Sequence, residues 1–158
     1  MKVLVVTKKA PEDSSSYWAQ GGIAAVMGED DSFADHVRDT LVAGAGLCNE
    51  AVVRHVVEAA PDVMRWLIDQ GVPFDLEGGE YHLTREGGHS RRRILHARDA
   101  TGRAVQDILL ARLRARENVT LLSQHIAIDL ITDRQLGGEG DASRNSVHGA
   151  YVLNTASG

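Results

Sequence analysis

Lys2–Thr7 reads Lys-Val-Leu-Val-Val-Thr, a continuous run of apolar and mostly β-branched residues near the start of the chain. Such a run is typical of a strand that is buried on both faces of a parallel sheet. A second apolar run, Val119–Leu122, follows a long intervening segment with helical spacing. A strand, a helical crossover and a second strand together predict an α/β fold.

Between these strands, residues with capping preferences divide the helical pattern into predicted helices. Ser32 is a suitable N-cap for the first helix, which Gly44 should end. Asn49 should cap a second helix, and Pro61 should occupy the first turn of a third, where its missing N–H costs little. Gly71 should stop that helix. The predicted inward-facing residues include Val37, Val52, Val53, Val56, Val57, Val63, Trp66, Leu67 and Ile68.

The remaining elements are a helix and three short or medium strands. Thr101 is predicted to cap an amphipathic helix, and Tyr81–Leu83 a short strand. Ala127–Thr132 and Val147–Leu153 have the pattern of two antiparallel strands, which the glycine-rich residues 137–146 would join as a ribbon.

The composition describes one acidic globular domain. A length of 158 residues fits one domain, and a net charge of −5 argues against a nucleic-acid-binding protein. The chain has one cysteine, Cys48, which excludes an internal disulfide and fits a reducing cytoplasm. The apolar runs are too short for a membrane span or a signal peptide.

The glycine-rich phosphate loop of dinucleotide-binding folds is missing from this sequence. Such a fold begins with a strand, a G-x-G-x-x-G turn and a helix. Gly44-Ala45-Gly46 is no substitute, because it follows a helix rather than a strand. We therefore expect an incomplete doubly wound, Rossmann-like domain with a helical excursion and a C-terminal antiparallel β ribbon.

Leu83–His96 gathers charged residues around a glycine pair, with the sequence Leu-Thr-Arg-Glu-Gly-Gly-His-Ser-Arg-Arg-Arg-Ile-Leu-His. Gly87 and Gly88 allow backbone conformations that side chains would forbid. Several cations beside one carboxylate, Glu86, suit a small anionic ligand that also carries a positive group. The alternative is a solvated basic turn without a ligand.

Two irregular segments make this chain resemble a known family. Ser14–Ala25 (Ser-Ser-Ser-Tyr-Trp-Ala-Gln-Gly-Gly-Ile-Ala-Ala) is similar to the flavin-binding loop of the succinate dehydrogenase/fumarate reductase flavoproteins. Leu83–His96, followed by Asp99-Ala100-Thr101-Gly102, resembles the substrate-side segment of the L-aspartate oxidase branch. The resemblance covers essentially the whole chain.

The resemblance implies a partial FAD-binding domain over residues 1–158. It would lack the N-terminal G-x-G-x-x-G unit as well as the capping and C-terminal helical domains. The full-length protein would oxidise L-aspartate to iminoaspartate in the cytoplasm, for quinolinate and NAD biosynthesis, and pass the electrons to oxygen or fumarate. This chain alone would be inactive, because the resemblance places the catalytic, proton-transferring arginine beyond its C-terminus.

The resemblance also implies which residues hold FAD. A serine at position 15 stands where the fumarate and succinate branch commonly has a flavin-linked histidine, so FAD should be bound noncovalently. Gly21 and Gly22 would permit close approach of the backbone. The expected cofactor-binding residues are Lys8, Ser15, Ser16, Tyr17, Trp18, Ala19, Gln20, Gly21, Gly22 and Ala127.

Glu86 is the expected substrate-binding residue. An added carboxylate would repel succinate or fumarate, whereas it can bind the ammonium group of aspartate. The alternative is a surface salt bridge from Glu86 to Arg85 or Arg92. His89, Ser90 and residues 91–93 could frame the flavin and substrate without a ranking among them, and no metal-binding set is expected.

Two other interpretations stay open. The chain could come from a succinate- or fumarate-type enzyme of the same family, against which Ser15 and Glu86 argue. It could also be a non-catalytic, truncated remnant, because a sheet without its first strand has an exposed edge.

Overall fold

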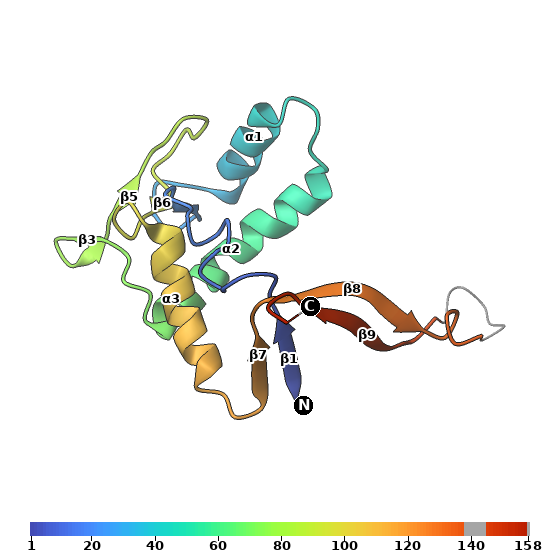
Figure 1. Cartoon of the computed structure of the whole chain (residues 1–158). Helices are drawn as coiled ribbons and strands as arrows, with labels where there is room; N and C mark the ends of the chain where they lie inside the picture. The colour runs from blue at the N-terminus through green and yellow to red at the C-terminus, as the bar shows by residue number, and fades with distance from the viewer. Residues whose placement is uncertain (138–144, 158) are drawn as a thin grey trace. The chain divides into compact units, whose positions relative to one another are not determined.

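A computed structural model of the chain describes residues 1–137 and 145–157, so most of the predicted 137–146 loop lies outside the described residues. The chain forms two compact units, Met1–Ser14 with Leu110–Gly158, and Ser15–Leu109 (Figure 1). Both helices and sheets are present, which confirms the predicted α/β class. No helix in the described part of the chain combines the length and apolar character needed to cross a bilayer.

In the first unit, β1 (Val3–Val6) pairs in parallel with β7 (Val119–Leu122), residue for residue. Both predicted strands and their parallel direction are confirmed. The expected burial on both faces is wrong for Leu4, whose side chain is 56% exposed. Successive side chains of a strand point to opposite faces, but only Leu4 is exposed, whereas Val3, Val5 and Val6 are partly buried.

The predicted antiparallel ribbon is confirmed in the same unit. It consists of β8 (His125–Thr132) and β9 (Val147–Asn154), drawn side by side in orange and red in Figure 1. The register shifts between Ala127 and Asp129, where one strand holds an extra residue. Such a bulge bends the strand locally.

The second unit contains α1 (Phe33–Ala43), α2 (Glu50–Gln70) and the start of α3 (Thr101–Arg114). The predicted caps are confirmed: Ser32 accepts a hydrogen bond from the Asp35 N–H, and Asn49 accepts one from Val52. Thr101 differs from the prediction, because it is the first residue of α3. Its hydroxyl oxygen accepts from the Ala97 N–H, 3.1 Å away, and so holds the preceding turn.

The predicted break at Pro61 is wrong, because α2 continues through this residue as one helix of 21 residues. Proline removes one helical hydrogen bond, but Pro61 is buried in line with Val57, Met64 and Leu67. Their spacing of three or four residues keeps one apolar face continuous. That face leaves out Trp66, which was predicted to lie inward and is 49% exposed. Val52, Val56 and Val63 are likewise exposed rather than inward.

Short strands connect the helices of the second unit. β2 (Ile23–Ala24), β6 (Ile94–Leu95) and β5 (Leu83–Thr84) form an antiparallel sheet in the order β2-β6-β5. β3 (Leu76–Glu77) and β4 (Glu80–Tyr81) form a separate hairpin. The single strand predicted at Tyr81–Leu83 is therefore wrong, because His82 separates two different pairings.

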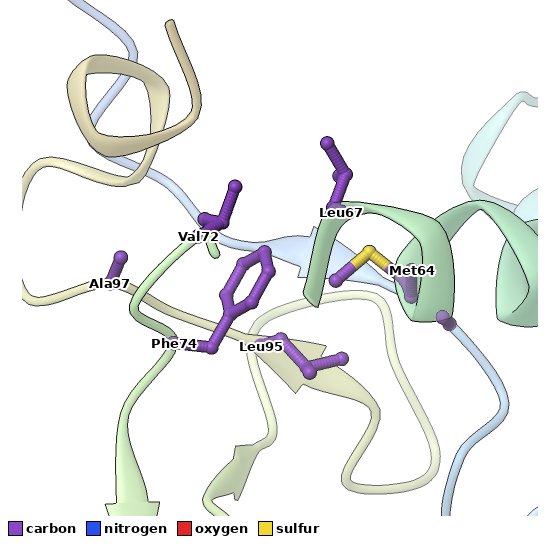
Figure 2. Packing of buried hydrophobic residues seen from close by; sticks show 7 residues of the cluster. Met64, Leu67, Val72, Phe74, Leu95 and Ala97 are labelled. Carbon is purple, nitrogen blue, oxygen red and sulfur yellow. The ribbon is translucent and has the colours of Figure 1, made fainter. Parts of the chain in front are cut away.

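The core of the second unit lies between α2 and β6. Figure 2 shows Phe74 and Leu95 next to Met64 of the helix, and Leu67 belongs to the same buried cluster. Met64 is fully buried, and Leu95 is 1% exposed. Burial of such side chains stabilises a fold by roughly 1.5–3 kcal/mol each. The packing fixes β6, which lies at the C-terminal end of the charged Leu83–His96 stretch and therefore positions that stretch.

Candidate functional site

The loop predicted to bind flavin, residues 15–22, rests on the first turn of α3. The Gly102 N–H donates to the Ala19 carbonyl oxygen at 3.0 Å. A Cβ atom on Gly102 would lie only 1.8 Å from the Ser16 carbonyl oxygen. Only glycine therefore allows α3 and this loop to approach so closely.

The other end of the loop rests on β6. A Cβ atom on Gly22 would lie 2.4 Å from Ile94 Cγ2, 2.5 Å from the Leu95 carbonyl oxygen and 2.9 Å from His96 Cε1. The neighbouring Gly21 differs, since a Cβ atom there would have no heavy atom within 4 Å. The loop is thus held at Gly22 and open at Gly21.

The side chains between these two anchors are available to a ligand. Ser15, Ser16 and Gln20 are exposed, and their side chains make no hydrogen bond within the described residues. Trp18 is 72% exposed and contacts the ring of Tyr17 edge-on, with centroids 5.7 Å apart. Unengaged donors and acceptors beside an open glycine backbone fit a phosphate- and ribityl-containing cofactor such as FAD.

Lys8 and Ala127, the other predicted cofactor residues, belong to the first unit. Lys8 is exposed and follows the carboxyl end of β1, the end at which parallel sheets bind ligands. Ala127 is exposed in β8, where it pairs with Val152 beside the register shift. Both remain predictions for cofactor binding.

Glu86, the predicted substrate-binding residue, is half-exposed and paired with a histidine. Its carboxylate Oε1 lies 3.0 Å from His96 Nε2. The same nitrogen lies 3.0 Å from the hydroxyl oxygen of Thr84. The alternative interpretation predicted a salt bridge from Glu86 to Arg85 or Arg92. In the structure Glu86 pairs with His96 instead.

Arg93 differs from Arg91 and Arg92, the other arginines of its cluster, because its side chain is completely buried. Its guanidinium group donates through Nε and one terminal nitrogen to both carboxylate oxygens of Asp31, each at 2.7 Å. Its other terminal nitrogen donates to Asp39 at 2.7 Å. The pairing with Asp31 is a bidentate salt bridge, the strongest arrangement of arginine and carboxylate. Because Asp31 and Asp39 occupy the buried guanidinium group, Arg93 is a structural residue rather than a ligand contact.

Asp39 also anchors the charged stretch to α1. Its Oδ2 accepts from the Ser90 N–H at 2.8 Å and from the Ser90 hydroxyl at 2.7 Å. Burial works to raise the pKa of Asp39, but the hydrogen bonds from Ser90 and Arg93 outweigh it and hold the pKa well below its usual range. Asp39 is therefore ionised when the protein is folded at neutral pH.

The histidine next to this network is neutral. His36 of α1 is buried, and its ring lies 5.7 Å from that of His89. Burial lowers the pKa of His36, and the positive charge of Arg93 lowers it further. An uncharged ring here avoids placing a second buried cation beside the guanidinium group.

The remaining arginines line a polar cavity of about 690 Å³. Arg91 and Arg92 are exposed there, whereas Arg93 lies outside it. The cavity can attract anions, because three of its lining residues are cationic and one is a carboxylate. Its lining is Asp30, His82, Thr84, Arg85, Ser90, Arg91 and Arg92.

The sequence analysis missed three contributors to this site: Asp31, Asp39 and His96. Asp31 and Asp39 lie on the polar side of the first helix and its cap, opposite three consecutive arginines, and this charge match was the available signal. In residues 1–137 and 145–157, no three His, Cys, Asp or Glu side chains gather so that they could hold a metal ion.

Residues 1–158 match the family described as "FAD binding domain". Two curated relatives, the L-aspartate oxidases of Pseudomonas aeruginosa and Vibrio cholerae, are 52% and 51% identical to this chain. They are matched over 100% and 97% of the chain, which spans only 30% and 29% of their own length.

A solved structure of E. coli quinol fumarate reductase has the same fold. It aligns with a TM-score of 0.84 and 28% sequence identity, over 97% of this chain and 25% of that chain. The similarity extends across both units, each of which therefore has a counterpart in a larger protein.

Proposed function

Because the chain belongs to the FAD-binding domain family over residues 1–158, we propose that it forms part of the FAD site of an L-aspartate oxidase. It would be the partial domain of a longer protein, without the phosphate-loop unit, the capping domain and the C-terminal helical domain. The longer protein would oxidise L-aspartate to iminoaspartate with FAD as the first electron acceptor, and oxygen or fumarate would then take the electrons from the reduced flavin. A reducing, cytoplasmic compartment is part of the proposal, since the chain has one cysteine.

The observation that carries this proposal is the position of Glu86. Its half-exposed carboxylate lies against His96, whose ring in turn contacts the proposed flavin loop at Gly22. A carboxylate there can bind the ammonium group of an amino acid. The same carboxylate would repel a plain dicarboxylate, so Glu86 favours aspartate over succinate.

The proposed roles divide the work between binding and orientation. FAD, when bound, supplies the acceptor for the hydride removed from the substrate Cα. Ser15, Ser16 and Gln20 would donate hydrogen bonds to it, Gly21 and Gly22 would allow its close approach, and the Tyr17–Ala19 segment would lie along it. Lys8 and Ala127 would hold the adenosine end. We assign no general base to this chain.

We expect the flavin of the full-length protein to be bound without a covalent link. A serine hydroxyl at position 15 does not form the flavin bond of a histidine. Acid denaturation should therefore release all of the yellow chromophore into the supernatant, where absorbance measures it. Flavin that stays with the precipitated protein would contradict this assignment.

Glu86→Gln in the full-length protein should raise the KM for aspartate by at least about tenfold, because a charge-assisted hydrogen bond contributes roughly 1.5–3 kcal/mol. The inhibition constant of succinate should stay the same or fall, since a repelling charge is gone. Steady-state aspartate oxidation with succinate as competitor measures both.

The control for this experiment is Glu58→Gln, which changes an exposed glutamate of α2 in the same way. It should leave both constants unchanged. Unchanged aspartate kinetics in Glu86→Gln would remove the reason for preferring aspartate. A wild-type protein that reduces fumarate but does not oxidise aspartate would instead favour the succinate- and fumarate-type enzymes.

A further inference from the structure

Glu86 does not stand alone, because the β2-β6-β5 sheet brings a histidine to it. Thr84 pairs with Ile94, and Ala24 pairs with Ile94 from the other side. His96 directly follows β6, and its Nε2 lies 3.0 Å from both the Thr84 hydroxyl oxygen and Glu86 Oε1.

The carbon atom next to Nε2 in the same ring lies close to the proposed flavin loop. His96 Cε1 lies 2.9 Å from the place where a Cβ atom of Gly22 would be. The ring thus lies close to both the proposed flavin loop and the substrate-side carboxylate, and a side chain at position 22 would collide with it. His96 is 21% exposed at its side chain, against 50% for Glu86.

The chemistry of the partners determines the direction of the hydrogen bond. An ionised carboxylate can only accept hydrogen bonds. Nε2 of His96 must therefore carry a hydrogen atom and donate a hydrogen bond to Glu86. The Thr84 hydroxyl can point its own hydrogen at the Ile94 carbonyl oxygen, 3.5 Å away, and can accept from the same histidine N–H. This hydrogen bond from His96 orients the Glu86 carboxylate.

We propose that His96 is a positioning residue that holds the Glu86 carboxylate in the orientation needed to bind the substrate ammonium group. The inference rests on the proposed function, because it assigns His96 to the same site. A free glutamate side chain has several rotatable bonds and would lose their entropy on binding substrate. His96 already restricts the Glu86 side chain before substrate binds, so less conformational entropy is lost on binding. Since Glu86 is proposed to bind the ammonium group, His96 should strengthen the binding only of substrates that carry one.

The test is His96→Ala in the full-length protein loaded with FAD. The KM for aspartate should rise about tenfold, as for loss of a hydrogen bond to a charged group, and kcat should change much less. The inhibition constant of succinate should be unaffected, since succinate has no ammonium group. General damage to the site would weaken the binding of both ligands.

Two further variants make the outcome specific. His96→Gln keeps an N–H donor near the position of Nε2 and should restore most of the aspartate affinity. His55→Ala, which removes an exposed histidine of α2, should change neither constant. In a Glu86→Gln background, His96→Ala should have no additional effect on the aspartate KM, because coupled residues are not additive.

The outcomes separate this inference from the proposed function. If Glu86→Gln weakens aspartate binding and His96→Ala does not, the positioning role is wrong and the proposed function stands. Equal weakening of aspartate and succinate in His96→Ala also overturns the positioning role. If the wild-type protein does not oxidise aspartate, the proposed function falls and the inference falls with it.

Discussion

Arg93→Met should lower the free energy of unfolding of the chain by about 3–5 kcal/mol, the usual effect of removing one partner from a buried ion pair. The guanidinium group is fully buried and donates to Asp31 and Asp39. Methionine keeps much of the length of the side chain but leaves two carboxylates without their cation. Equilibrium urea unfolding, followed by circular dichroism, measures the change.

The matched control is Arg54→Met. Arg54 pairs with Glu50 on the surface of α2, where both side chains are more than half exposed. An exposed pair of this kind contributes roughly 0–1 kcal/mol, so the control should change stability little. Equal effects of the two substitutions would contradict a structural role for the Arg93 network.

The effect of Arg93→Met should also depend on pH. Because the pKa of Asp39 is lowered in the folded chain, its ionised form stabilises the fold above the unfolded pKa of about 4. That contribution is lost as the pH falls below this value toward the folded pKa. The stability difference between wild type and Arg93→Met should therefore shrink in acid.

Gly102→Ala should weaken FAD binding by at least about tenfold, even though alanine is the better helix former by roughly 1 kcal/mol. A Cβ atom at this position would lie 1.8 Å from the Ser16 carbonyl oxygen and 3.0 Å from that of Ala19. Both are backbone atoms of the proposed flavin loop, so the loop must move as a whole. Titration of FAD with the full-length protein, followed by flavin fluorescence, measures the affinity.

Gly149→Ala is the control for adding the same methyl group. Its Cβ atom would lie 3.6 Å from Ile131 Cδ1, an ordinary contact, so FAD binding should be unchanged. Unfolding measurements should show Gly102→Ala less stable than wild type by about 1–3 kcal/mol, as for overpacking. A Gly102→Ala protein with higher stability and normal FAD affinity would mean that the loop does not rest on α3 as described.

The elements that were predicted correctly depend on short-range interactions. Ser32 and Asn49 each bond to an N–H three residues ahead, and Gly71 adopts the left-handed conformation, with φ of 98°, that glycine permits. The strand Val119–Leu122 has the predicted bounds. Patterns of this kind are visible because their causes lie within a few residues.

The errors in α2 have a different origin. Pro61 looks like a helix start in the sequence, since its preference for the first turn is a local property. In the folded chain Pro61 is buried in line with Met64 and Leu67, and those two residues pack in the same cluster as Leu95 of β6. The same packing selects one helix face, which leaves Trp66 half-exposed although the apolar residues Leu67 and Ile68 follow it in the sequence.

The sequence was sufficient to indicate the α/β class, the helix caps at Ser32 and Asn49, and a lone carboxylate at Glu86, because these depend on residue type and local spacing. Only the folded chain could show that Arg93 differs from its neighbours, since its partners Asp31 and Asp39 are 62 and 54 residues away. The fold also places His96 close to both Gly22 and Glu86. Contacts across such separations depend on the path of the backbone, which the core around Met64 and Leu95 holds in place.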